Sequence, residues 1–423
     1  MIQLINFPFR SDYPELCERP QIESSKIDSL IESIFNKVKT DKDEALISLT
    51  YEFEKRKIDS ILYTEKEIDA YSEATDDDLK TAIKIAFDNI YKFHEAQKLV
   101  EKRVETSPGV VCWQKSSPIE KVGIYIPGGT APLFSTILML AIPAKIAGCS
   151  EIVLCTPGIH PAIFYTAKLC GITKMCKVGG AQAIAALALG TPSIPKVYKI
   201  FGPGNQYVTA AKMHANSMGV TIDMPAGPSE VAIYADETAN ARFVASDLLS
   251  QAEHGIDSQV FLVSPSETLM QETIREIETQ INDLPRKELA KEAILNSKFI
   301  LVENQEDAID LLNEYAAEHL ILACDDPEKM ADKIINAGSI FLGHYTPESA
   351  GDYSSGTNHT LPTNGHARAY SGVNLDSFCK KITLQSISKS GLEILSKSII
   401  PMAEAESLQA HANAVKVRLN NGI

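Results

Sequence analysis

The sequence predicts an α/β protein built of two doubly wound parallel-sheet units, with a helical N-terminal region and a small C-terminal tail domain. Three observations support this prediction. Amphipathic helices fill residues 22–100, short apolar strands alternate with helices between residues 122 and 342, and the alternation stops after Asn374. Strands that alternate with helices form right-handed crossovers, which place neighbouring strands parallel to one another.

The N-terminal region is expected to be helical. Its first helix is indicated by apolar residues at spacings of three and four, which mark one buried face. A second helix is expected at about residues 77–97, and strands are expected between residues 106 and 126, where two turn signals separate them. The apolar face of the first helix comprises Ile27, Leu30, Ile31, Ile34 and Val38.

Two α/β units follow this region. Each consists of short apolar strands separated by helices, the pattern of a parallel sheet that is covered on both faces. The first unit comprises strands at 122–126, 152–155, 175–178, 197–201 and 220–223, with helices at 133–147, 161–170, 181–189 and 206–217. The second unit comprises strands at 231–234, 260–263, 299–302, 320–323 and 339–342, with helices at 237–254, 267–281, 306–317 and 327–337.

The tail after Asn374 is predicted to contain one extended stretch at 379–388, followed by helices near 391–399 and 403–417. A segment this small has little hydrophobic core of its own. We therefore expect the tail to pack against another part of the protein or against another chain.

The composition limits the kinds of molecule that the protein is expected to bind. The 423 residues suffice for two or three domains, and 55 acidic against 40 basic residues give a net charge of −15. Nucleic acids and anionic membranes require basic surfaces, so neither is expected as a partner. The chain has no run of eighteen apolar residues, and its first residues lack the features of a signal peptide. We expect a cytoplasmic enzyme that acts on a small molecule.

The cysteines limit the kinds of metal site. The chain has eight cysteines, they lie scattered in apolar segments, and no two form a C-x-x-C pair. This layout is typical of reduced cytosolic cysteines and excludes a zinc site made of thiolates. A site with nitrogen and oxygen ligands remains open.

Three glycine loops follow predicted strand ends, at residues 127–130, 179–182 and 202–206. Ligands of open parallel sheets bind at the carboxyl ends of the strands. The segment from Gly202 to Tyr207 resembles G-x-G-x-x-G but ends in tyrosine, so the dinucleotide fingerprint is incomplete. Such loops are often only tight turns, but three in one sheet favour a bound nucleotide or phosphate.

Two pairs of side chains could take part in metal binding or catalysis. Gln251 and His254 are three residues apart near the end of a predicted helix, where they would share one face and could form half of a metal site. A helix end with His254 opposing the dipole and Gly255 terminating the helix explains this pattern equally well. Glu318 and His319 form a carboxylate–imidazole pair at a helix-to-strand junction, a common position for general bases, although a plain helix end also fits.

Further candidates lie closer to the C-terminus. Asp352 fits a turn residue as well as a ligand. Glu406 and His411 are five residues apart on a predicted tail helix, so their side chains would face directions about 140° apart. Spacing alone does not single out any of these residues as functional.

Eight motifs together resemble the histidinol dehydrogenase family, whose members convert L-histidinol to L-histidine. The resemblance covers about residues 25–419, and chance agreement across so many motifs is not credible. The motifs are Val122-Gly-Ile-Tyr-Ile-Pro-Gly-Gly, Val178-Gly-Gly-Ala-Gln-Ala-Ile, Phe201-Gly-Pro-Gly-Asn-Gln-Tyr-Val, Ala226-Gly-Pro-Ser-Glu, Leu249-Ser-Gln-Ala-Glu-His-Gly, Ala317-Glu-His-Leu, Ser349-Ala-Gly-Asp-Tyr and Ser355-Gly-Thr-Asn-His.

This resemblance implies a zinc-dependent, NAD-linked, four-electron oxidation of L-histidinol through the aldehyde histidinal. It implies a homodimer with intertwined tails, one zinc ion per subunit, and Glu318 and His319 as the acid–base pair. It implies that Gln251, His254, Asp352 and His411 bind zinc and the substrate, that Ser229, His319, His359 and Glu406 also contact the substrate, and that Tyr125, Gln182 and Asn205 contact NAD. His411 and Glu406 would reach the site of the partner chain.

We accordingly predict four segments with distinct roles. They are an N-terminal arm at 1–23, a discontinuous first α/β domain at 24–121 plus 233–373 with the metal and acid–base residues, a second, incomplete Rossmann-like domain at 122–232 on the NAD side, and a dimerisation tail at 374–423. Three other functions compete with this prediction: a thiol-dependent aldehyde dehydrogenase using Cys112, Cys149 or Cys155, a zinc hydrolase, and a nucleotide-binding regulatory protein.

Overall fold

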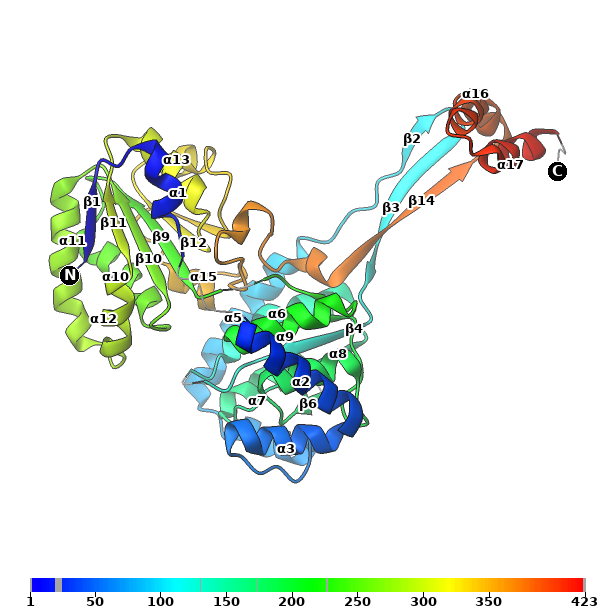
Figure 1. Ribbon diagram of the computed structural model, residues 1–423. Helices are drawn as coiled ribbons and strands as arrows, with labels where there is room; N and C mark the ends of the chain where they lie inside the picture. The colour runs from blue at the N-terminus through cyan, green and yellow to red at the C-terminus, as the bar shows by residue number, and fades with distance from the viewer. Residues whose placement is uncertain (1, 20–24, 130, 173, 226, 421–423) are drawn as a thin grey trace.

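The computed structural model describes residues 2–19, 25–129, 131–172, 174–225 and 227–420, and it shows two α/β bodies from which a long arm extends (Figure 1). The predicted α/β class with parallel sheets is confirmed. Thr130 of the first glycine loop, Ala226 of the 226–230 motif and residues 20–24 at the end of the predicted N-terminal arm lie outside the described residues. Among the described helices, none is both long and apolar enough to cross a membrane.

The body from the middle of the chain contains a five-stranded parallel sheet. Its strand order is β6 (Lys174–Cys176), β5 (Glu151–Cys155), β4 (Lys121–Tyr125), β7 (Lys199–Phe201) and β8 (Thr221–Ile222). Helices α6 (Phe134–Ala147) and α7 (Pro161–Leu169) share one hydrophobic cluster, and α8 (Gly180–Leu189) and α9 (Gln206–Ser217) share another. The crossovers therefore change face between β4 and β7, which makes this position the topological switch point where ligands bind.

The N-terminal helices pack on this same body. Helices α2 (Ser25–Asp41) and α3 (Asp43–Glu54) join the cluster of α8 and α9, whereas α4 (Glu65–Glu73) and α5 (Asp77–Glu95) join that of α6 and α7. The domain prediction had grouped residues 24–121 with residues 233–373. The helices of residues 24–121 instead pack on the five-stranded sheet. The periodicity of a helix reveals its apolar face and does not specify which sheet that face covers.

The second body contains a six-stranded parallel sheet. Helix α12 (Lys287–Leu295) was not predicted, and the N-terminal arm adds an edge strand, β1 (Gln3–Asn6), to this sheet. The strand order is β1 (Gln3–Asn6), β11 (Lys298–Leu301), β10 (Gln259–Ser264), β9 (Glu230–Ala235), β12 (His319–Ala323) and β13 (Ser339–Leu342). One cluster holds α10 (Ala241–Ala252), α11 (Glu267–Gln280) and α12 (Lys287–Leu295), and the other holds α1 (Tyr13–Leu16), α13 (Gln305–Tyr315) and α14 (Pro327–Ala331).

Two predicted helices are shorter than expected. The helix predicted at 237–254 begins only at Ala241, because the Asn240 side chain caps it by accepting the N–H of Arg242. The same helix ends at Ala252. His254 therefore lies beyond the helix, and the expectation that it shares a helix face with Gln251 is wrong. The helix predicted at 327–337 ends at Ala331.

Short elements complete the two bodies. Helix α15 (Glu348–Tyr353) follows β13 and was not predicted. Single-turn 3-10 helices lie at η1 (Arg10–Asp12), η2 (Ile281–Asp283), η3 (His366–Arg368) and η4 (Leu375–Phe378).

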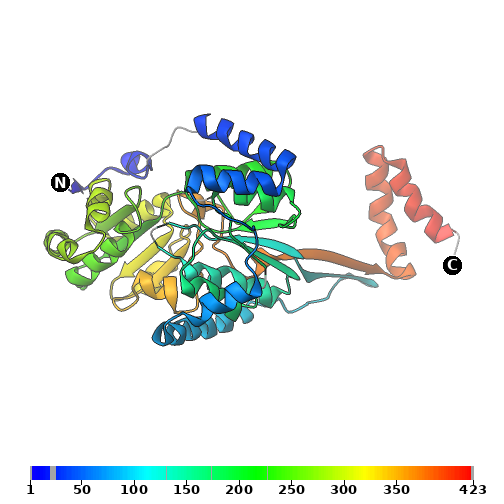
Figure 2. The same cartoon turned by 90° about the horizontal axis from the view of Figure 1, so that it is seen from below.

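The long arm, which is separate from the N-terminal arm at residues 1–23, is a three-stranded antiparallel ribbon with two helices at its far end (Figures 1 and 2). Strand β14 (Cys379–Ile387) pairs along its length with β3 (Val110–Pro118), which also pairs with β2 (Val104–Ser107). Both views place α16 (Lys389–Ala405) and α17 (Gln409–Asn420) away from the two bodies.

The tail helices differ from the prediction at one point. Ser407 has a left-handed φ of 60°, which interrupts the helical hydrogen bonding between α16 and α17. Glu406 caps the end of α16, and His411 lies in the first turn of α17. The expectation that these two residues occupy one continuous helix is therefore wrong.

Candidate active site

A cleft of about 280 Å³ lies between the two bodies, and seven of the predicted site residues line it. The six-stranded sheet contributes its amino edge, where β9 and β12 begin, and the five-stranded body contributes the loop after β7 and the start of α6. The seven predicted residues are Ser229, Gln251, His254, Glu318, His319, Asp352 and His359.

The topology explains why these residues meet. Strands β9 and β12 are parallel neighbours, with His319 beside Val231, so Glu318 and His319 lie next to the segment that precedes β9. Helix α10 starts at the carboxyl end of β9 and runs back along the sheet, because a right-handed crossover must return to the amino edge. The end of α10 therefore delivers Gln251 and His254 to the same place.

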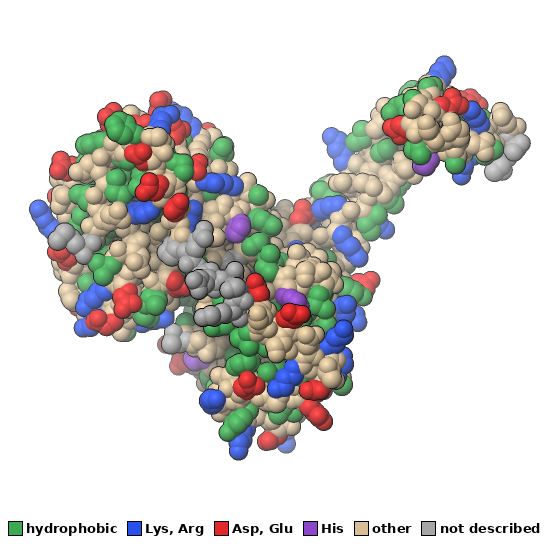
Figure 3. Space-filling model, viewed as in Figure 1, with side chains coloured by type: hydrophobic (Ala, Val, Ile, Leu, Met, Phe, Trp, Pro, Cys, Tyr) green, Lys and Arg blue, Asp and Glu red, His purple; other side chains and the backbone are tan. Residues whose placement is uncertain are grey.

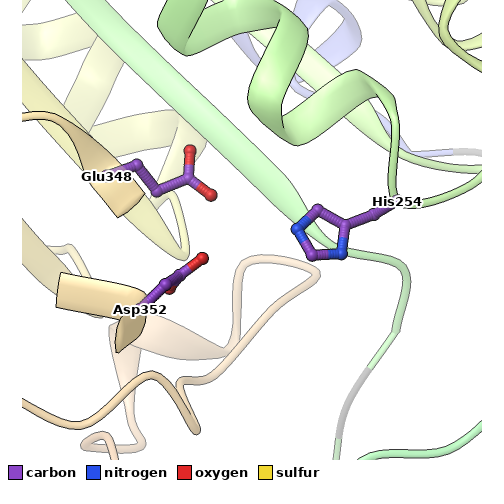
Figure 4. Close-up of side chains that lie close together, drawn as sticks. All are labelled: His254, Glu348 and Asp352. Atoms are coloured by element: carbon purple, nitrogen blue, oxygen red, sulfur yellow. The ribbon is translucent and has the colours of Figure 1, made fainter. Parts of the chain in front are cut away.

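His254, Glu348 and Asp352 form a compact cluster at this edge (Figure 4). One ring nitrogen and one oxygen of each carboxylate all lie within 4.8 Å of one another. Glu348 is buried, while His254 is exposed at the cleft, although the desolvation of its ring by surrounding protein still lowers its pKa. A neutral imidazole at neutral pH is the form that binds a metal ion.

Glu348 was not predicted, although the sequence contains a signal for it. Glu348 and Asp352 are four residues apart on α15, a spacing that directs two side chains to one helix face. A prediction of this short helix would have paired the two carboxylates before the structure was known.

The side chain of Gln251 lies beside this cluster and adds an amide group to it. Its amide oxygen faces a carboxylate oxygen of Glu348, acceptor against acceptor. Turning the amide by 180° would let its nitrogen donate to Glu348 and its oxygen accept from the N–H of Glu230 at 3.1 Å. The amide can therefore present either its oxygen or its nitrogen to this corner of the cleft. An imidazole, an amide oxygen and carboxylates form a donor set that fits zinc or another divalent metal.

Glu318 is held by the backbone beside this cluster. Its carboxylate accepts the N–H of Glu230 at 3.0 Å, and only 6% of the residue is exposed. Burial raises the pKa of Glu318 to about 7 because the charged form is poorly solvated. A carboxylate whose pKa lies near neutrality is well suited to take up and release a proton.

His319 lies among three carboxylates. Its Nδ1 is 3.6 Å from Glu318 and 3.8 Å from Glu348, and its Nε2 is 3.5 Å from Asp352. Burial by itself would lower the pKa of His319, but the carboxylates of Glu348, Glu318 and Asp352 outweigh that effect and raise the pKa to about 10. This corner of the cleft thus carries an excess of negative charge, which a bound cation would offset.

His359 connects the two bodies behind the cleft. Its Nδ1 donates to the backbone carbonyl of Asp352 at 2.7 Å, and its Nε2 lies 2.9 Å from the hydroxyl of Thr136 on α6. Both ring nitrogens therefore have partners within the protein, and burial lowers the pKa of the ring. The geometry gives His359 a structural role, while its contact with the substrate stays a prediction.

The residues predicted to contact NAD lie around the five-stranded sheet. The Tyr125 hydroxyl accepts the N–H of Gly180 at 3.1 Å, and the Gln182 amide donates to Glu54 at 3.2 Å. The Asn205 side chain caps α9. Tyr125 and Gln182 are buried, and Asn205 lines a larger cavity of about 1530 Å³ that shares Gly204 with the cleft.

The loop after β7 passes close to the backbone at the end of β4. Gly202 has a φ of 132°, and a Cβ atom there would lie 2.0 Å from the carbonyl oxygen of Tyr125. The loop leads directly into α9, and the N-terminus of a helix attracts phosphate groups. The start of α9 therefore fits the phosphate groups of a cofactor such as NAD.

The two predicted site residues of the tail lie away from the cleft. Glu406 and His411 are exposed on the arm, and neither lines either cavity. A single chain thus brings together three of the four predicted metal ligands, and the fourth is on the arm.

The cysteines give no support to a thiol mechanism. None of the described residues that line the cleft is a cysteine. Cys149 and Cys155 are buried, and burial raises the pKa of the Cys149 thiol to about 12. Cys112 lies on β3 of the arm. None of the three thiols proposed as nucleophile is in position to act beside Glu318 and His319.

Comparison with known proteins agrees with this site. A model of the histidinol dehydrogenase family matches residues 17–419. Histidinol dehydrogenases of Bacteroides thetaiotaomicron and Bacteroides fragilis are 54% and 55% identical to the chain, and each comparison covers 99% of both proteins. The crystal structure of histidinol dehydrogenase from Elizabethkingia anophelis is similar with a TM-score of 0.98 at 52% identity, over 99% of this chain and 98% of that one. The resemblance that the motifs indicated is confirmed.

Proposed function

The chain belongs to the histidinol dehydrogenase family, and we propose that it oxidises L-histidinol to L-histidine through histidinal in a zinc-dependent, NAD-linked, four-electron reaction. One observation gives this proposal its main support. The buried pair Glu318 and His319 lines the same cleft as Gln251, His254 and Asp352, and the last two belong to the cluster of metal-ligating groups. A proton acceptor next to a metal site suits the oxidation of a bound alcohol.

Each protein group has a defined task in this proposal. Gln251, His254 and Asp352 would hold zinc, and the loop at Gly202 would border NAD. When bound, zinc would orient the nitrogen atoms of the substrate and add positive charge, and NAD would accept one hydride in each oxidation.

The acid–base pair would act in sequence. His319 would accept the hydroxyl proton of the alcohol as a neutral imidazole, once positive charge bound in the cleft offsets the three carboxylates that raise its pKa. Hydride would leave the carbon that bears the hydroxyl group. Glu318 then removes a proton from the water that adds to the aldehyde, and its pKa of about 7 suits that exchange. After it has released the first proton to solvent, His319 would deprotonate the resulting hydrate, which loses the second hydride and becomes the carboxylic acid. Because the cleft lies between two bodies, the reactive aldehyde can be retained between the two steps.

The decisive assay measures NADH from purified protein, L-histidinol and NAD. We expect two NADH per histidinol consumed, loss of activity after chelation, and recovery when zinc is added back. Turnover without NAD would favour the zinc hydrolase, in which Glu318 only activates water. Binding of NAD without any formation of NADH would favour a regulatory protein.

We further propose that the protein is a homodimer whose arms complete the sites of the partner chains. The space-filling view shows the arm standing clear of both bodies, with hydrophobic side chains at its far end (Figure 3). These exposed side chains on and between α16 and α17 would be covered by a second copy of the chain. They are Ile394, Met402, Leu408 and Val417.

Mixing two inactive variants tests the shared site. His411→Ala and His254→Ala chains should each be inactive as homodimers. In a mixed dimer one site carries both changes and the other carries neither, so each heterodimer should recover up to about half of the wild-type activity by twofold symmetry. Co-refolded mixtures are assayed for NADH formation, with heterodimers verified by differential tags. Verified heterodimers without activity would show that His411 does not act across the interface.

A further inference from the structure

A buried ion pair connects the N-terminal arm to the first residue of β9. The Nε of Arg19 donates to the carboxylate of Glu230 at 2.8 Å, and the two side chains are only 11% and 2% exposed. Both charges lie in a region of low dielectric, where each depends on the other for its stability. The pair is therefore more than an exposed surface contact.

The main chain of Glu230 contacts the acid–base pair. Its N–H donates to the carboxylate of Glu318 at 3.0 Å, and its carbonyl oxygen lies 3.3 Å from Nδ1 of His319. The position of this one peptide segment thus determines the orientation of both side chains. The side chain of the same residue is the partner of Arg19.

Arg19 also holds the segment that leads into Glu318. A second guanidinium nitrogen donates to the backbone carbonyl of Tyr315 at 2.6 Å, and the guanidinium lies 4.0 Å above the centre of the Tyr315 ring. Tyr315 ends α13, and the next residue, Ala316, has a left-handed φ of 53°. A cation at a helix C-terminus stabilises the free carbonyl groups there.

We infer that Arg19 is a positioning residue for the proposed oxidation, because its guanidinium joins the two backbone segments that orient Glu318 and His319. This inference rests on the proposed function. Without the guanidinium, the Glu230 carboxylate would be buried and unpaired, and the start of β9 would have to shift to hydrate it. Small displacements of groups that carry out the chemistry are costly, since about 1 Å can change a rate by about 10²-fold.

The experiment compares Arg19→Met with Arg10→Met. Arg10 also connects the N-terminal arm to α13, through Asp307 at 2.9 Å, but its ion pairs are with Asp307 and Asp310 rather than with Glu230. We expect Arg19→Met to lower kcat by about 10–10²-fold with little change in KM for histidinol. Arg19→Lys should recover part of kcat, since lysine restores the positive charge but cannot reproduce the planar guanidinium that donates to both Glu230 and Tyr315. Arg10→Met should keep wild-type kcat.

A second measurement separates positioning from general stability. Hydrogen–deuterium exchange, followed by mass spectrometry on the metal-loaded protein, should rise in Arg19→Met in peptides that cover 227–235 and 315–323. Arg10→Met should leave exchange there unchanged. If Arg19→Met does not fold, two other variants take its place in both measurements. One is Arg19→Lys, and the other is the double variant R19M/E230Q, which removes both charges of the ion pair.

The outcomes distinguish the inference from the proposed function. Loss of thermal stability in Arg19→Met or its substitutes, with unchanged kcat and unchanged local exchange, would overturn the positioning role. Wild-type protein that forms no NADH from histidinol would overturn the proposed function instead. In that case raised exchange at 227–235 and 315–323 in Arg19→Met would still support the connection to Glu318 and His319, and unchanged exchange would refute it.

Discussion

His319→Asn is expected to slow both oxidations by about 10²–10⁴-fold, the usual range for loss of a general base. Asparagine retains a polar side chain but cannot accept a proton, so deprotonation of the alcohol and of the aldehyde hydrate should both suffer. The measurement is single-turnover NADH formation, started separately from histidinol and from histidinal. Near-normal rates in either half-reaction would show that another group removes that proton.

Glu318→Gln provides the matched comparison. Glutamine fills the same buried space and can still accept the N–H of Glu230, so the fold around it should be preserved. Oxidation of the aldehyde should slow far more than oxidation of the alcohol, since only the aldehyde step needs an activated water. Equal slowing of both half-reactions would contradict the division of tasks between Glu318 and His319.

His254→Ala is expected to lose stoichiometric zinc and at least about 10²-fold in activity while remaining folded. The cluster would lose its imidazole, and the oxygen atoms that remain form a weaker zinc site than a mixed set. Zinc content is measured after dialysis, and folding is followed by circular dichroism.

The control for this prediction is His366→Ala. His366 lies on η3 and lines neither cavity, so its loss should change neither metal content nor turnover. A His254→Ala protein that retains one zinc ion and normal turnover would show that the metal, if present, is bound elsewhere.

The amino-acid sequence by itself determined the local elements and the class of the fold. Apolar strands of fitting length, separated by amphipathic helices, are compatible only with parallel sheets, and each of the ten strands predicted between residues 122 and 342 is present. The glycine loops after β4 and β7 were also evident, and at Gly202 glycine is needed because a Cβ atom would meet the backbone of Tyr125. The motifs were specific enough to indicate the family, and the comparisons confirm it.

Only the tertiary structure decided how these elements combine. The acid–base pair lies at the amino edge of its sheet, while the predicted ligand loops lie at the carboxyl edge of the other, and the cleft forms where the two edges face each other. The position of His254 beyond α10, the packing of α2 to α5 on the five-stranded sheet and the meeting of Arg19 with Glu230 were likewise unforeseen. Local periodicity reports which face of an element is buried. The partner of that face depends on contacts between residues hundreds of positions apart, which no local pattern records.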